Sequence, residues 1–142
     1  MESAERRTRT QHLVTEMLEE RQEMWVLYCK VAGLEPFTQE GSVREVLERF
    51  CQVLVDYIST GHFGLYERIA EGKERRVAVR DAAAEVYEQI STSTDVAVRF
   101  NDAYDASGEF ELGDTFASDL SSLGEALALR IELEDKILSR MV

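Results

Sequence analysis

The strongest constraint on the fold is a helical spacing of apolar residues that recurs along most of the chain. Before Ser59, apolar side chains recur at the i, i+3, i+4, i+7 spacing of a single buried helix face. The members of this stripe are Val43, Val46, Leu47, Phe50, Leu54, Tyr57 and Ile58. The chain has one proline and eight glycines, so positions that break a helix are few. No segment alternates polar and apolar residues as a strand would. The sequence therefore predicts an all-α fold.

Stop and start signals divide the chain into four long helices and one short helix. Gly33 and Pro36 end the first helix, because proline disfavours helical geometry in the residue before it. Ser42 and Glu45 form a capping box at the start of the second. Asp114 or Thr115 is expected to cap the last helix. The expected helices span about 11–32, 42–58, 62–71, 75–105 and 114–138.

Helices joined by short connections pack most economically as an antiparallel bundle. We expect residues 1–142 to form a single domain, an antiparallel four-helix-bundle-like fold with one additional short helix. The polar residues 1–10 are expected to be frayed or weakly helical. The Ser91 to Asp95 run has poor helix propensity and is a possible kink in the helix over 75–105.

Charge and hydropathy narrow the class of protein. No apolar run approaches the length of about 20 residues that a membrane span needs, and the N-terminus lacks the apolar region of a secretory signal. We therefore expect a cytoplasmic protein without membrane association. The net charge of −12 argues against direct binding of nucleic acid and favours a basic partner. Simple solubility explains the same charge equally well.

Polar residues gather in the stretch from 56 to 67. Gly61 tolerates a positive φ, so we expect one helix to stop there and another to begin at His62. A helix junction with this much hydrogen-bonding capacity needs buried partners or a ligand. The polar residues are Asp56, Tyr57, Ser59, His62, Tyr66 and Glu67.

Near the C-terminus, Glu134 falls within an apolar stripe, and Arg130 precedes it by one helical turn. A carboxylate that faces a bundle core is costly unless it is paired or hydrogen-bonded. We therefore predict that the two polar stretches meet in space. The predicted structural network comprises Tyr57, His62, Tyr66, Arg130 and Glu134.

Two other readings of the polar stretch remain open. In the first, Asp56 and its neighbours are displayed to a protein partner, because Asp56 lies two residues after core Leu54 and turns towards the bundle edge. In the second, the polar residues form a metal or catalytic site. The chain has only two histidines and no Glu-x-x-His pair, so we expect no metal, no cofactor and no enzymatic activity. Cys29 and Cys51 are isolated and are expected to be small buried hydrophobes.

The chain contains two long motifs. The first is FCQVLVDYISTGHFGLYERI, from Phe50 to Ile69, and the second is LGEALALRIELEDKIL, from Leu123 to Leu138. Both resemble motifs of the Rsd/AlgQ regulators. The resemblance implies an all-helical cytosolic anti-sigma regulator that binds the principal sigma factor of RNA polymerase through its C-terminal helix-turn-helix domain. Covering that domain would block its contacts with the −35 promoter element and with core enzyme. The implied activity is sequestration, without catalysis.

The resemblance also implies a set of partner-binding residues. Asp56 matches a partner-contacting aspartate of the family, expected to pair with an arginine of sigma, and Leu13 matches an apolar position in the first helix. The full expected set is Leu13, Met17, Asp56, Ser59, His62, Phe63 and Glu67. The chain departs from the family in carrying Thr15-Glu16-Met17-Leu18 where an Asp-Arg-Trp-Leu run is common.

Two other functions remain alternatives. One is a helical interaction module for a different regulatory protein. The weaker one is a bundle that binds a ligand or metal through its polar cluster. Competition by promoter DNA distinguishes sigma capture from the first alternative, and a metal assay tests the second.

Overall fold

The computed structural model describes residues 2–33, 43–105 and 113–141, and all regular structure in these ranges is helical. The all-α prediction is confirmed. Of the helices described, none combines the length and the apolar character that crossing a bilayer requires. The elements are α1 (Glu2–Ala32), α2 (Val43–Gly61), η1 (His62–Tyr66), α3 (Glu67–Ala70), α4 (Val77–Tyr104) and α5 (Asp114–Leu138).

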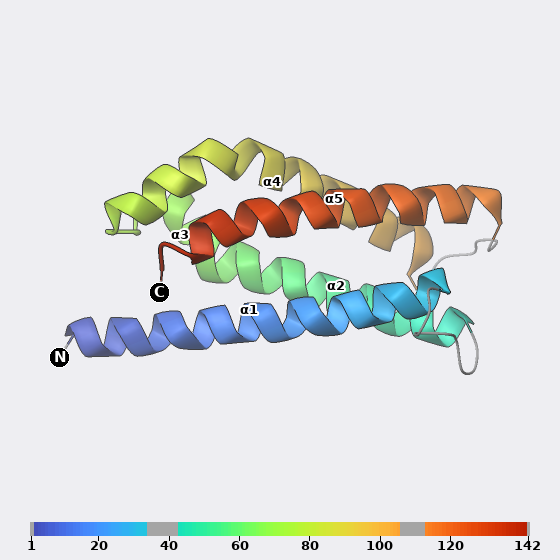
Figure 1. Ribbon diagram of the computed structural model, residues 1–142, viewed down its shortest axis with the longest axis horizontal. Helices are drawn as coiled ribbons and strands as arrows, with labels where there is room; N and C mark the ends of the chain where they lie inside the picture. Colours follow the sequence, from blue (N-terminus) through green and yellow to red (C-terminus); the bar gives the residue numbers. More distant parts are fainter. Residues whose placement is uncertain (1, 34–42, 106–112, 142) are drawn as a thin grey trace.

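The four long helices pack as two antiparallel pairs. Figure 1 shows α1 beside α2 and α4 beside α5, with successive long helices running in opposite directions. Contacts of α2 with α4 and of α1 with α5 join the pairs. This arrangement lets each amphipathic helix bury its apolar stripe against two neighbours.

The apolar core has two clusters, one on each side of a buried polar layer. On α5, Leu123 and Leu127 belong to the first cluster and Leu133 and Ile137 to the second. Buried Arg130 and Glu134 lie at the boundary between them. The same order holds on α1, where Met24 belongs to the first cluster and Met17 to the second.

Helix α1 begins earlier than the sequence predicts. The sequence predicts that residues 1–10 are frayed or weakly helical, and in the structure α1 is helical from Glu2. Thr10 is buried, and its hydroxyl accepts a hydrogen bond from Nη1 of Arg76 at 3.5 Å. Tertiary contact with the start of α4 thus supports a turn whose own sequence is only weakly helical.

The expected helix break at Gly61 is wrong. Gly61 has φ −64° and ψ −47°, and the chain continues from α2 through a π-helical turn, η1, into α3. Gly61 is buried, and a Cβ there would lie 3.3 Å from Cε2 of Tyr66 and 3.6 Å from Nη2 of Arg130. The glycine therefore provides space for these two side chains.

Other helix ends agree with their local signals only in part. Gly33 and Gly72 have positive φ values of 70° and 75° and follow the ends of α1 and α3. Gly113 precedes α5, and no side chain caps that helix, so Asp114 and Thr115 do not act as the expected caps. Ser42, the expected cap of α2, lies outside the described residues.

Candidate functional site

A buried carboxylate, that of Glu134, is the centre of the polar layer. The hydroxyl of Tyr57 donates a hydrogen bond to Oε1 of Glu134, and the hydroxyl of Tyr66 donates one to Oε2 at 2.8 Å. The side chain of Glu134 is 0% exposed. These donors replace the water that the carboxylate loses on folding. The structure thus brings the two polar stretches of the sequence together.

Arg130 connects α5 to α4. Its Nη1 donates to the hydroxyl oxygens of Thr94 at 2.7 Å and Ser93 at 3.1 Å. Its Nε lies 3.6 Å from Oε2 of Glu134, so their attraction is electrostatic without a hydrogen bond. The Ser/Thr run in α4 therefore supplies the hydrogen-bond acceptors for the buried guanidinium group of Arg130. In Figure 1, α4 is continuous through this region and visibly arched.

Arg21 is a member of this layer that the sequence analysis missed. Its Nη2 donates to Glu134 at 2.8 Å and its Nη1 to Asp135 at 2.7 Å. Burial alone would lower the pKa of Arg21, but the hydrogen bonds to these two carboxylates outweigh burial and raise the pKa. A sequence signal existed, because Arg21 interrupts the apolar stripe between Met17 and Met24.

The two tyrosine hydroxyls remain protonated over an unusually wide pH range. Burial is the largest cause, and the adjacent Glu134 charge adds to it; together they raise the pKa values of Tyr57 and Tyr66. Both phenols therefore stay hydrogen-bond donors to Glu134 at neutral pH. The layer positions four helices, since its members come from α1, α2 with η1, α4 and α5.

His62 does not lie in this layer. Its side chain is exposed, and its ring contacts the ring of Phe63 edge to face with centroids 4.8 Å apart. Phe63 is itself 66% exposed. The π-helical turn places Leu65 and Tyr66 in the core and leaves His62 and Phe63 on the outside.

On the surface, α1 and α2 carry an acidic face, defined here by Glu16, Glu20 and Asp56. Asp56 is exposed and accepts a hydrogen bond from Nε2 of Gln52 at 3.2 Å. Glu20 accepts one from the Thr60 hydroxyl at 3.0 Å, while its Oε2 is buried without a partner among the described residues. Burial, and then the charges of Glu16 and Asp56, raise the pKa of Glu20. This face therefore holds carboxylates that a cation would stabilise.

The other expected partner-binding residues differ in their accessibility. Met17 is 0% exposed and belongs to the core, so it cannot form the apolar anchor expected on the surface. Leu13 is half-buried and packs so closely on Gly64 that a Cβ there would lie 2.5 Å from its Cδ1. Ser59 and Glu67 are half-buried.

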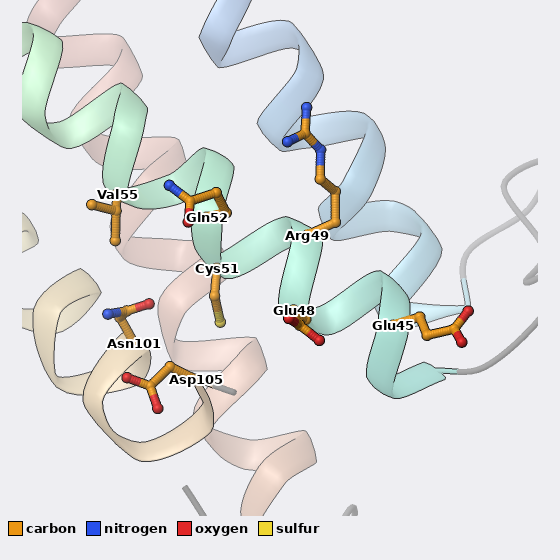
Figure 2. Close-up of a pocket in the computed structure, with 8 residues that line it drawn as sticks. All are labelled: Glu45, Glu48, Arg49, Cys51, Gln52, Val55, Asn101 and Asp105. Atoms are coloured by element: carbon orange, nitrogen blue, oxygen red, sulfur yellow. The ribbon is translucent and has the colours of Figure 1, made fainter. Parts of the chain in front are cut away.

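A cleft of about 580 Å³ lies between α2 and the end of α4. Figure 2 shows Glu45, Glu48 and Gln52 along α2. Across from them lie Asn101 of α4 and Asp105, the residue that follows α4. Cys51 points between the helices, where burial, and then Asp105, raise the pKa of its thiol to about 12. The thiol is therefore protonated and unreactive at neutral pH. The cleft is thus lined mainly by polar and acidic side chains, with Arg49 also in its lining.

The described residues do not assemble a metal site, because no group of three or more His, Cys, Asp or Glu side chains among them is arranged to hold an ion. The polar groups that the structure does bring together are engaged with one another in the buried layer. The accessible surface of the described residues carries acidic, basic and apolar side chains.

The comparison with protein families identifies the family of this chain. The family model described as "Regulator of RNA polymerase sigma(70) subunit, Rsd/AlgQ" matches residues 1–142. The chain belongs to the Rsd/AlgQ family. This family regulates the sigma70 subunit and is non-enzymatic, in agreement with the predicted absence of catalysis.

Two relatives of this Rsd/AlgQ chain are proteins named "Regulator of sigma D". The chain is 36% identical over 135 residues to the "Regulator of sigma D" of Yersinia enterocolitica, an alignment that covers 89% of this chain and 78% of the relative. It is 37% identical over 134 residues to the protein of that name from an Enterobacter species, with the same coverages. The comparison with solved structures gave no match.

Proposed function

We propose that this Rsd/AlgQ protein sequesters the principal sigma factor of RNA polymerase by binding its C-terminal helix-turn-helix domain in the cytoplasm. The bound domain would lose its contacts with the −35 promoter element and with core enzyme. The observation that carries the proposal is the exposed carboxylate of Asp56 on the acidic face, in a chain whose whole length matches a family of sigma70 regulators.

Charge supports this partner. A helix-turn-helix domain meets DNA phosphates with arginines and lysines, and the same residues suit a chain of net charge −12. Burial raises the pKa of Glu20 most, and the nearby charges of Glu16 and Asp56 add to this effect, which is consistent with repulsion within the acidic face of the free protein. An arginine of sigma that reaches Asp56 would relieve this repulsion.

Apolar contact would accompany the charges. Phe63 is exposed, as Asp56 is, and it lies in η1, which continues directly from α2. Leu13 of α1 packs on Gly64, next to Phe63. These side chains replace Met17 as the apolar part of the proposed surface. An aromatic beside a charged pair is a common composition for the energetic centre of an interface.

Calorimetry with the isolated C-terminal domain of a principal sigma factor tests the proposal. At about 0.1 M salt, where charges within roughly 10 Å still interact, we expect one-to-one binding that weakens as salt is added. Asp56→Arg should weaken binding by about 2–5 kcal/mol, because it places like charge against the partner's arginine. Promoter DNA carrying a −35 element should compete with the protein for the same domain.

A matched control separates this contact from net charge. Asp95 is exposed on α4, in the other helix pair, and Asp95→Arg changes the net charge of the protein as much as Asp56→Arg does. The control should bind like the wild type, with circular dichroism verifying the fold of both variants. Equal losses in the two variants would reject the acidic face as the docking site. Absence of wild-type binding would reject sigma capture through this domain.

A further inference from the structure

We propose that a cluster of arginines at the start of α1 and around α3 is a binding site for a small, multiply charged phosphate anion. The cluster surrounds a cavity of about 210 Å³. Its lining comes from the first turns of α1, from α3 and from the connection between α3 and α4. The lining residues are Arg6, Arg9, Arg68, Lys73, Glu74 and Arg75.

Most of the positive charge in this cavity is not neutralised. Glu74 is buried and bound by Arg76 through Nε at 2.8 Å and Nη2 at 3.1 Å, so this carboxylate is balanced. Lys73 is paired with Glu71 at 2.8 Å. Four arginines remain without an ion pair to any described residue, namely Arg6, Arg9, Arg68 and Arg75.

Glu74 also fixes the positions of the residues around the cavity. Its Oε1 accepts a hydrogen bond from the backbone N–H of Arg76 at 3.0 Å, and the Arg76 side chain then reaches Thr10 of α1. Arg76 is the residue that immediately precedes α4. These hydrogen bonds fix the segment between α3 and α4 against α1. As a result, Arg75 and Arg9 line the same cavity. Such fixed positions lower the entropy that a ligand would lose when it binds.

This concentration of cations contrasts with the rest of the molecule. The chain carries 28 acidic and 16 basic residues, and five of the basic ones line this single cavity. Like charges gathered at one place destabilise a free protein, and an anion removes that cost. Screening over about 8–10 Å at physiological salt lets a local cluster act on a compact ligand despite the negative total.

The chemistry of the lining and the size of the cavity select the ligand class. One planar guanidinium group can donate two parallel hydrogen bonds to two oxygens of a phosphate, whereas a lysine ammonium group cannot. Pockets for drug-sized molecules hold about 300–1,000 Å³, so 210 Å³ suits a phosphate or diphosphate group. A long nucleic acid would extend beyond the cavity onto a protein of net charge −12 and be repelled.

Titration of the full chain with inorganic pyrophosphate, followed by calorimetry at about 0.1 M salt, tests this site. We expect one-to-one binding that is tighter than for inorganic phosphate. Arg9→Glu and Arg75→Glu, both at exposed positions, should each weaken binding by about tenfold or more, because each removes a charge-assisted hydrogen bond and adds repulsion. Thermal unfolding checks that the variants remain folded.

Arg99→Glu is the matched control, because it reverses an exposed arginine on α4 that does not line the cavity. It should bind pyrophosphate as the wild type does. The proposal is overturned if pyrophosphate fails to bind at millimolar concentration, or if Arg99→Glu weakens binding as much as Arg9→Glu does. Tighter binding of a single-stranded oligonucleotide than of pyrophosphate would overturn the assignment to a small anion.

Discussion

Glu134 shows how a single buried carboxylate can be retained in a helical core. It receives hydrogen bonds from Tyr57, Tyr66 and Arg21, and the charge of Arg130 lies one turn away. Apolar residues in place of both Glu134 and Arg130 could give equal or higher stability, because buried ion pairs rarely add net stability. What the polar layer adds is specificity of register, since each donor comes from a defined position on a different helix.

Removal of this carboxylate should be severe. Glu134→Ala leaves the guanidinium of Arg130 buried without its neighbouring anion and leaves both tyrosine hydroxyls without an acceptor. We expect a loss of about 3–5 kcal/mol in the free energy of unfolding, measured by urea denaturation. Glu132→Ala, at an exposed position two residues away, should change stability by less than about 0.5 kcal/mol. A loss below about 1 kcal/mol for Glu134→Ala would contradict this account of the layer.

Among the elements, α1 and α5 approach each other through a glycine. Gly124 of α5 is buried, and a Cβ there would lie 2.7 Å from Cζ of Tyr28 on α1. The Tyr28 hydroxyl donates to the carbonyl oxygen of Leu120 at 3.0 Å, which holds the ring across the helix. Glycine at this position therefore costs helix propensity but permits the contact between the two helix pairs.

Gly124→Ala tests this contact between elements. The added methyl group would displace the Tyr28 ring and its hydrogen bond, so we expect a destabilisation of about 1–3 kcal/mol despite the better helix propensity of alanine. Gly113→Ala is the control, because a Cβ at Gly113 meets nothing within 4 Å. Chemical denaturation of both variants gives the comparison. An unchanged or higher midpoint for Gly124→Ala would show that the ring is not held as described.

At the scale of the whole molecule, the polar layer joins all four long helices. Its buried tyrosines make the folded state less stable at alkaline pH. The folded-state pKa values of Tyr57 and Tyr66 are raised by burial and by Glu134 above the ordinary value near 10. A raised folded-state pKa means that the stabilisation is complete below pH of about 10 and is lost as pH rises further. The folded protein then competes with an unfolded chain whose tyrosines ionise.

We expect the free energy of unfolding to fall between pH of about 10 and 11, with each buried tyrosine contributing up to about 1.4 kcal/mol per pH unit. The Tyr66→Phe variant should lose less stability over this interval than the wild type does. Tyr87→Phe, at an exposed position, keeps the buried hydroxyls and is the control. Urea unfolding at a series of pH values measures the slopes. Identical slopes for wild type and Tyr66→Phe would reject this linkage.

The sequence by itself determined the helices and their inward faces. A stripe such as Val43 to Ile58 depends only on the 3.6-residue period, which is a local property of the backbone. For the same reason, Glu134 and Arg130 were recognisable as polar groups on a buried face. The family motifs likewise lie in contiguous residues, so the regulator class was accessible without tertiary information.

Tertiary structure decided which groups meet. Arg21 reaches Glu134 and His62 does not, because the axial positions of α1 and η1 relative to α5 depend on packing among all the helices. Packing also buries Met17 and gives Gly61 a spatial role, where the sequence indicated a surface anchor and a helix break. The helical period of the sequence specifies the side of the helix on which a residue lies. The residue that it contacts on a neighbouring helix depends on the crossing angle and the register of the two helices. Those quantities exist only in the assembled bundle.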